Sequence, residues 1–316
     1  MKTIKITPRG YCHGVVNAVN TITNLDHLSM KFPVYILGMV IHNKQMVKSL
    51  KSLGYITLHD PTKTRLELLE LIDSGTVIFT AHGVSPKVYK RASEKGLEII
   101  DTTCNDVFKS QSIIKEYLNK GYDILYIGKH SHPESEAVSG ISNKIHIVEN
   151  ISDLKLSHIE NDKIIITNQT TMSIYDVFNI SEFAKEIYPN IEVINEICNS
   201  TRIRQEAISD IPLEVNHVYV VGDKLSHNSK KLVEVAITKG LKSSSLIESI
   251  EDIDLSELSN FSCVAVSSGA STPTKVTSEV IKFLEQFEKD DISTHDISTK
   301  LTTNNLLRTK VDKSTI

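Results

Sequence analysis

Long apolar runs are missing from this sequence of 316 residues. No stretch approaches the roughly 20 consecutive apolar residues that a membrane helix needs, so we expect no membrane segment. The first residues, Met1–Ile6, predict a strand rather than a secretory signal. An excess of basic residues is missing too, because the formal net charge is −4, which argues against a nucleic-acid-binding protein.

Cysteine is scarce, and the common nucleotide-binding motifs are absent. Four cysteines are too few for a disulfide scaffold and fit a reducing compartment, so we expect a cytoplasmic protein. Neither a P-loop nor a GxGxxG fingerprint occurs, which leaves the chain without a recognisable nucleotide or flavin site. A hydrophobic content of 40% and a charged content of 23% predict a globular chain that buries a core.

Three of the four cysteines are spaced almost evenly along the chain. Cys12 and Cys104 are 92 residues apart, and Cys104 and Cys198 are 94 residues apart. Each follows an apolar run typical of a strand and precedes a run typical of a helix, where the helix N-terminus favours a thiolate. The spacing predicts one building block used three times. Cys263 lies within a strand-like run, and we expect it in the core.

Two further sets of segments repeat with a similar period. Strand-like runs that end in glycine are followed by polar loops, at Val34–Gly38, Ile124–Gly128 and Val218–Gly222. A second set of strand-like runs leads into loops rich in hydroxyl, amide or imidazole groups, at Val77–Thr80, Ile164–Thr167 and Val264–Ser267. Self-similarity of this kind indicates internal repeats.

The alternation of strand and helix patterns predicts an α/β fold. We expect three similar small α/β units of about 85–100 residues, a size that can carry its own core, with mainly parallel sheets in a pseudo-threefold arrangement around a central iron–sulfur site. The predicted parts are an N-terminal strand with the first candidate ligand, three α/β units and a polar C-terminal tail, at 1–12, 13–103, 104–197, 198–288 and 289–316. The polar loops follow strand ends, the edge where open α/β sheets bind ligands.

Cysteines contributed singly by three repeats favour a cluster over a structural zinc. Thiolates select zinc, Cu(I) or iron–sulfur clusters, and structural zinc usually takes a fourth ligand with CxxC-like spacing, which this sequence lacks. A cubane cluster normally takes four cysteines. Three ligands at Cys12, Cys104 and Cys198 would leave one iron open to water or substrate.

The polar loops carry hydrogen-bond donors suited to a phosphate or diphosphate. Imidazoles follow strand ends in the first two copies, and hydroxyls and an amide occupy matching places elsewhere, at His42, His82, His132, Thr170, Ser226, Asn228 and Ser271. Glu134 is the carboxyl within these loops. It could act as a general acid or only counter a helix dipole, and the sequence leaves both open.

Taken in order, the motifs resemble the 4-hydroxy-3-methylbut-2-enyl diphosphate reductases, iron–sulfur enzymes that perform the last step of the methylerythritol phosphate route to isoprenoids. The resemblance runs from about residue 4 to residue 287. It is carried by Pro8-Arg-Gly-Tyr-Cys12, Val40-Ile-His42-Asn43, Ala81-His82-Gly-Val-Ser85, His132-Pro-Glu134, Asn168-Gln-Thr170-Thr, Ile203-Arg-Gln205 and Gly269-Ala-Ser271.

This resemblance implies a role for each candidate. Cys12, Cys104 and Cys198 would hold a [4Fe–4S] cluster whose fourth iron binds the substrate hydroxyl. Glu134 would deliver protons, and Thr170 would order the hydroxyl and a nearby water. The diphosphate would be held by His42, His82, His132, Ser226, Asn228 and Ser271. Reduced ferredoxin or flavodoxin would supply electrons for the small allylic diphosphate substrate.

Departures from the family pattern occur beside these residues. His13 follows Cys12, and Asn105 follows Cys104. His227 stands where relatives often carry a second serine, and it is a further candidate contact for the diphosphate. Two other functions remain open: a cluster-dependent dehydratase that needs no electrons, and a non-enzymatic iron–sulfur sensor. We expect a monomer.

Overall fold

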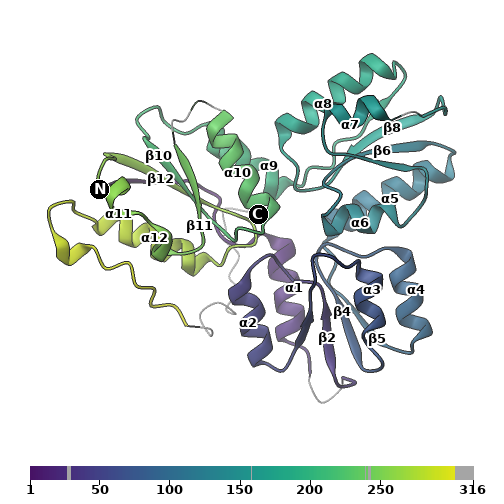
Figure 1. Ribbon diagram of the computed structural model, residues 1–316, viewed down its shortest axis with the longest axis horizontal. Coiled ribbons are helices and arrows are strands. Elements are labelled where there is room, and N and C mark those ends of the chain that lie inside the picture. The colour runs from purple at the N-terminus through teal and green to yellow at the C-terminus, as the bar shows by residue number, and fades with distance from the viewer. Residues whose placement is uncertain (27–29, 158, 239, 241–242, 303–316) are drawn as a thin grey trace. The chain divides into compact units, whose positions relative to one another are not determined.

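The computed structural model describes residues 1–26, 30–157, 159–238, 240 and 243–302 (Figure 1). Within these residues, strands β1–β12 alternate with helices α1–α12 along most of the chain. The strands form three four-stranded sheets, and every strand pair in them is parallel. The predicted fold class, three α/β units with parallel sheets, is therefore confirmed.

The first sheet has the order β3-β2-β4-β5. Its strands are β2 (Val34–Leu37), β3 (Ile56–Leu58), β4 (Thr76–Phe79) and β5 (Glu98–Asp101). Helices α3 (Arg65–Glu70) and α4 (Pro86–Glu94) pack on one face of it, where Leu68 and Val88 meet Leu37, Val77 and Phe79. Pro86 begins α4, as its missing N–H allows.

The second sheet has the order β7-β6-β8-β9. Its strands are β6 (Asp123–Ile127), β7 (Ile145–Val148), β8 (Ile164–Asn168) and β9 (Glu192–Val193). Helices α7 (Ile151–Leu156) and α8 (Ile174–Ile187) cover one face, and α5 (Asn105–Asn119) and α6 (Pro133–Ser139) cover the other (Figure 1). Both faces are buried, which explains why the central strands read as continuous apolar runs.

The third sheet has the order β1-β12-β10-β11. Its strands are β1 (Lys2–Lys5), β10 (His217–Val221), β11 (Ser244–Ile247) and β12 (Cys263–Ser268). The accompanying helices are α9 (Asn199–Ser209), α10 (His227–Thr238), α11 (Leu255–Leu258) and α12 (Thr274–Gln286). The first strand of the chain thus completes the last sheet, and all three sheets share one order.

Contacts divide the chain into two compact units. A terminal unit comprises residues 1–20, 41–49 and Asn199 onward and contains the third sheet; a middle unit comprises 21–40 and 50–198 and contains the other two sheets. Helices α1 (His13–Thr23) and α2 (Lys44–Ser52) begin in the terminal unit and end in the middle unit. The boundaries at residues 12, 103, 197 and 288 stay a prediction.

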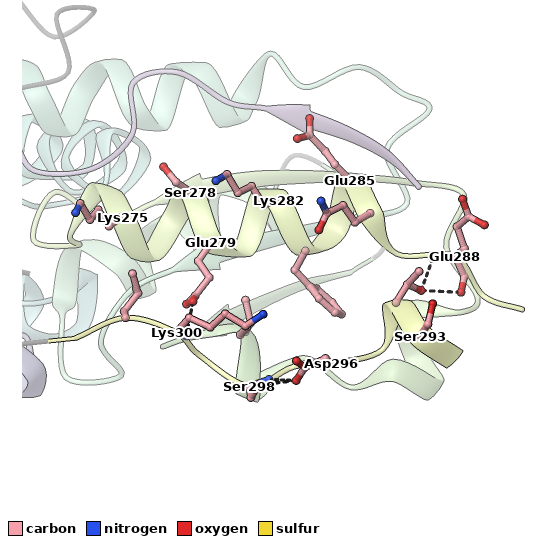
Figure 2. Close-up of a pocket in the computed structure, with 15 residues that line it drawn as sticks. Lys275, Ser278, Glu279, Lys282, Glu285, Glu288, Ser293, Asp296, Ser298 and Lys300 are labelled. Atoms are coloured by element: carbon pink, nitrogen blue, oxygen red, sulfur yellow. Dashed lines mark hydrogen bonds between the residues drawn. The ribbon is translucent and has the colours of Figure 1, made fainter. Parts of the chain in front are cut away.

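The polar segment after α12 is partly described. A short 3-10 helix, η2 (Ile292–Thr294), precedes an irregular stretch in which the Lys300 N–H donates to Glu279 of α12 at 2.7 Å (Figure 2). Ile297 and Leu301 pack against the core of the third sheet. This segment and α12 line a cavity of about 920 Å³, and none of its described lining residues is a predicted site residue. Residues 303–316 of the predicted tail lie outside the described chain.

Candidate active site

The three predicted ligand cysteines occupy equivalent places in the three sheets. Each follows an outer strand, β1, β5 or β9, and each directly precedes a helix, α1, α5 or α9. In every case the cysteine N–H donates at 3.0 Å to a carbonyl in the loop after the adjacent strand: Cys12 to Ala270, Cys104 to Ala81 and Cys198 to Thr170. The repeat inferred from spacing is thus a repeat of backbone geometry.

Burial separates these cysteines from the fourth. Cys12, Cys104 and Cys198 are half-buried, whereas Cys263 is buried in β12, as expected of a core residue. The thiol of Cys104 lies 3.8 Å from a carboxylate oxygen of Asp106, which stands in the first turn of α5. Three half-buried cysteines at helix N-termini suit a thiolate-bound metal group, and their assignment as ligands stays a prediction.

In the second sheet, the loop after β6 positions the candidate acid, Glu134, next to His132. His132 is the N-cap of α6, and its Nδ1 accepts the N–H of Glu134 at 3.1 Å, so the neutral imidazole carries its proton on Nε2. Pro133 begins the helix, which fixes the backbone between the two side chains. His132 and Glu134 are both buried.

The Glu134 carboxyl is held from both sides by one residue of the loop after β8. Thr170 donates its Oγ1–H to one carboxyl oxygen and its N–H to the other, each at 3.0 Å. Burial raises the pKa of Glu134 to about 7, although the two Thr170 bonds pull it down and the nearby Asp106 adds a small increase. A carboxyl with this pKa exists in both protonation states near neutral pH, as a general acid requires.

His82 joins the same cluster in the middle unit. Its ring lies edge-on to that of His132, with the centroids 5.6 Å apart, and its Nδ1 is 3.4 Å from the hydroxyl of Thr80 at the end of β4. The structure therefore brings together His82, His132, Glu134 and Thr170, which the sequence placed in three different segments.

In the third sheet, the loops after β10 and β12 gather neutral donors. The hydroxyl oxygens of Ser226 and Ser271 are 3.4 Å apart, and Ser226 Oγ also accepts the N–H of Ser229. Asn228 is 6% exposed, and among the described residues neither its Oδ1 nor its Nδ2 has a hydrogen-bond partner. A buried amide without partners is costly, so this group is suited to a polar ligand.

His42 and His227 complete the predicted set in the terminal unit. His42 is half-buried and lies two residues before α2, and His227 is the buried first residue of α10. His42, His132 and Ser226 each stand four residues after the glycine that directly follows β2, β6 or β10. Matched positions therefore carry two imidazoles and one hydroxyl.

Sequence reasoning missed Asp223, which directly follows Gly222 at the end of β10. Its carboxylate is 4% exposed and accepts two backbone N–H groups, from Lys44 at 3.0 Å and from Leu225 at 2.8 Å. Asp223 also lines a cavity of about 190 Å³ in the terminal unit. The corresponding positions after Gly38 and Gly128 hold Met39 and Lys129, so the repeat gave no signal for a carboxylate there.

These features define a class of protein: an α/β chain of three parallel sheets with one half-buried cysteine and one set of polar loops per sheet. Within the described residues, none of the helices combines the length and apolar character needed to cross a bilayer. Residues 3–285 match the model of the family described as LytB protein. The chain belongs to this family.

Relatives of known name are similar over nearly the whole chain. The 4-hydroxy-3-methylbut-2-enyl diphosphate reductase of Geobacillus kaustophilus is 50% identical over 301 residues, which cover 93% of each chain. The enzyme of the same name from Bacillus subtilis is 47% identical, covering 93% of this chain and 94% of its own.

Solved structures of similar proteins agree with the fold. The E-1-hydroxy-2-methyl-but-2-enyl-4-diphosphate reductase of Plasmodium falciparum aligns with a TM-score of 0.84 at 31% identity, covering 92% of this chain and 89% of that one. A second structure, titled as the terminal enzyme of the non-mevalonate pathway, aligns with a TM-score of 0.60 at 28% identity, covering 91% and 100%.

Proposed function

We propose that this chain reduces 4-hydroxy-3-methylbut-2-enyl diphosphate to isopentenyl diphosphate and dimethylallyl diphosphate, the last step of the methylerythritol phosphate route. The reaction breaks the allylic C–O bond and consumes two electrons and two protons. One proton leaves with the hydroxyl as water, and the other forms the new C–H bond. The observation that carries the proposal is the buried Glu134 carboxyl, held by Thr170 with a pKa of about 7 beside two imidazoles.

Cys12, Cys104 and Cys198 would hold a [4Fe–4S] cluster. The donor set fits such a group, because soft thiolates at three equivalent helix N-termini match its ligand preference and supply one ligand fewer than its four irons. When bound, the cluster would supply electrons singly and an iron that acts as a Lewis acid.

Glu134 would serve as the proton source. When Glu134 is protonated, the bond to the Thr170 hydroxyl would reverse: the carboxyl would donate to Thr170 Oγ1, and the Thr170 O–H would then donate to the substrate hydroxyl. His132 fixes the backbone of Glu134 through its Nδ1, so the acid is held in place before substrate binds.

The polar side chains of the other loops would bind the diphosphate. His82 and His132 supply imidazole N–H donors, and Ser226, Asn228 and Ser271 supply hydroxyl and amide donors. We assign His42 and His227 to the same task, since each stands at the start of a helix whose N–H groups favour an anion.

Electrons would come from reduced ferredoxin or flavodoxin, since the sequence has no nucleotide fingerprint of its own. We place the reaction in the cytoplasm, where thiols stay reduced. None of the four cysteines, all within the described residues, is paired in a disulfide. We propose a monomer as the working unit.

The test is an anaerobic preparation of the wild type and of the Cys104→Ser and Cys263→Ser variants. We expect iron, sulfide, visible absorbance and reductant-dependent turnover in the wild type and in Cys263→Ser, and loss of all four in Cys104→Ser, because a ligand is gone. Cluster content and full turnover in Cys104→Ser would refute the ligand assignment. Conversion of the allylic diphosphate without any reductant would instead support a dehydratase.

A further inference from the structure

Two segments of the terminal unit that carry proposed diphosphate ligands meet at a single carboxylate. The first segment is Ile41–Ser49, which holds His42 and the start of α2. The second is the loop after β10, which holds Ser226 and leads to Asn228. Asp223 Oδ2 accepts the N–H of Lys44, two residues after His42, and Asp223 Oδ1 accepts the N–H of Leu225, the residue before Ser226.

The burial of Asp223 makes these two bonds decisive for its conformation. The side chain is 4% exposed, and a buried carboxylate is costly unless its oxygens are hydrogen-bonded. Both oxygens accept a backbone N–H, and the N-terminus of α2 adds a favourable dipole. The Ser226 N–H also donates to the Asp223 carbonyl at 2.9 Å, so the loop is closed around this residue.

Helix α2 does not depend on Asp223 for its own cap. Asn43 Oδ1 already accepts the N–H of Met46 at 2.8 Å, which is the bond a residue preceding a helix usually makes. A second, indirect link runs through Glu248, the residue after β11, whose Oε1 lies 3.7 Å from Lys44 Nζ and accepts the N–H of Lys224 at 3.3 Å. Its side chains are partly exposed to solvent, so this link is weak. The bond that the buried Asp223 carboxylate accepts from Lys44 is direct and short, so it is the stronger described connection between the segments.

We infer that Asp223 is a positioning residue for diphosphate binding, because it fixes the His42 segment relative to the loop of Ser226 and Asn228. The inference rests on the proposed function of those three residues. Asp223 itself does not contact the anion in this role, since both of its oxygens are committed to backbone N–H groups. Removing the carboxylate loosens two binding segments at once, which raises the cost of ordering them around the ligand.

The experiment compares Asp223→Asn with Asp254→Asn in the cluster-loaded full chain. Asp254 is a control for the change of residue type at a helix remote from the proposed ligands: it is exposed, and its Oδ1 accepts two backbone N–H groups, from Ser256 and Glu257, at α11. An asparagine keeps one acceptor oxygen and turns an N–H₂ toward the other backbone N–H, so Asp223→Asn loses one of its two bonds. A second variant, Glu248→Gln, tests the exposed link.

For Asp223→Asn we expect KM for the allylic diphosphate to rise about tenfold, with kcat within about threefold of the wild type. The dissociation constant for inorganic diphosphate, measured by calorimetry, should rise by a similar factor. Cluster absorbance should stay unchanged. Asp254→Asn and Glu248→Gln should leave KM and the diphosphate affinity within about twofold of the wild type.

Unchanged KM and diphosphate affinity in Asp223→Asn would overturn the inference. A lower unfolding temperature with unchanged affinity would also overturn it, because Asp223 would then have only a structural role. These outcomes differ from failure of the proposed function, in which the wild type itself would not reduce the allylic diphosphate. Because the dissociation constant for inorganic diphosphate does not depend on turnover, it tests the positioning role of Asp223 whether or not the wild type reduces the allylic diphosphate.

Discussion

The loops after Gly128 and Gly222 have the same framework and opposite chemistry. Each loop follows an inner strand of its sheet, β6 or β10, and leads into a helix, α6 or α10. Six residues after the glycine, the first loop carries Glu134 and the second carries Asn228, and both side chains are buried. Glu134 has both oxygens bonded to Thr170, whereas the Asn228 amide has no described partner.

The glycines show why the framework is shared. A Cβ on Gly128 would lie 2.7 Å from the hydroxyl of Ser135, and one on Gly222 would lie 2.3 Å from that of Ser229. Ser135 and Ser229 both stand seven residues after their glycine, in the first turn of the following helix. The same close approach of helix and strand therefore builds both loops. The side chain six residues on then decides whether the loop supplies a proton or a neutral donor.

The largest effect is expected from substitutions that change the ionisable or neutral character of the two matched side chains. Glu134→Gln keeps the shape and removes the titrating proton, so we expect kcat to fall at least about a hundredfold while substrate still binds. Asn228→Asp places a charge next to the diphosphate, so we expect KM to rise with a smaller change in kcat. Steady-state kinetics of both variants, with cluster absorbance as control, separates the two effects. A near-normal kcat in Glu134→Gln would reduce Glu134 to a helix cap.

A second test uses pH, since Glu134 has a pKa near neutrality and the amide at the matching position, Asn228, does not titrate. The pKa of Glu134 is raised to about 7 by burial, so its acid form is lost as pH rises through that value. We expect kcat to fall about tenfold per pH unit above pH 7 in the wild type. The Glu134→Gln variant should show a flatter profile over the same range. An identical slope in both proteins would assign the titration to another group.

The same shift has a consequence for folding stability. Because the folded pKa of Glu134 lies above its ordinary value of 4.5, the folded chain binds more protons than the unfolded chain between about pH 4.5 and 7. The contribution of this group to the free energy of unfolding is therefore fully present below pH 4.5 and is lost as pH rises through 7. Above pH 7 the buried Glu134 carboxylate therefore lowers the stability of the folded chain. A loss of this kind is common at functional sites, where the pKa values of acids are shifted by burial.

The fold was largely predictable because the three repeats are visible in the sequence as regularly spaced residues. The even spacing of Cys12, Cys104 and Cys198, and of the strand-end glycines, predicted three α/β units, and three parallel sheets of one order confirm them. Strands and helices that pack in a core need a periodic pattern of apolar residues. This pattern lies within a short stretch of sequence, so it can be recognised there. That β1 completes the third sheet was not predicted, since strand pairing over 260 residues leaves no local pattern.

The residue types of the candidate site could be predicted from the sequence, whereas the contacts between these residues could be predicted less well. Glu134 was left open between acid and helix cap, because its pKa depends on burial and on Thr170, 36 residues away. Asp223 was missed for the same reason: its partners are a backbone N–H of Lys44 and one of Leu225, and backbone donors have no sequence signature. Long-range hydrogen bonds are decided by tertiary structure, and only the structure reveals them.

A smaller effect is expected when the hydrogen bond from the Thr170 hydroxyl to Glu134 is removed, a bond that has no described counterpart at Asn228. Thr170→Val removes the hydroxyl that donates to the carboxyl at 3.0 Å and leaves the backbone donor in place. Because that bond favours the charged form, its loss should raise the pKa of Glu134 by about one unit, the size expected for one hydrogen bond to a charged group. The descending limb of the pH profile should move to higher pH by the same amount.

Thr171→Val is the matched control for this shift. Thr171 is the next residue, and its hydroxyl accepts from the side-chain amide of Gln169 rather than bonding to Glu134. Its variant should keep the midpoint of the wild type even if the overall rate falls. A midpoint that moves downward in Thr170→Val, or equally in both variants, would mean that the Thr170 hydroxyl does not stabilise the Glu134 carboxylate. The difference between the two loops would then rest on burial alone.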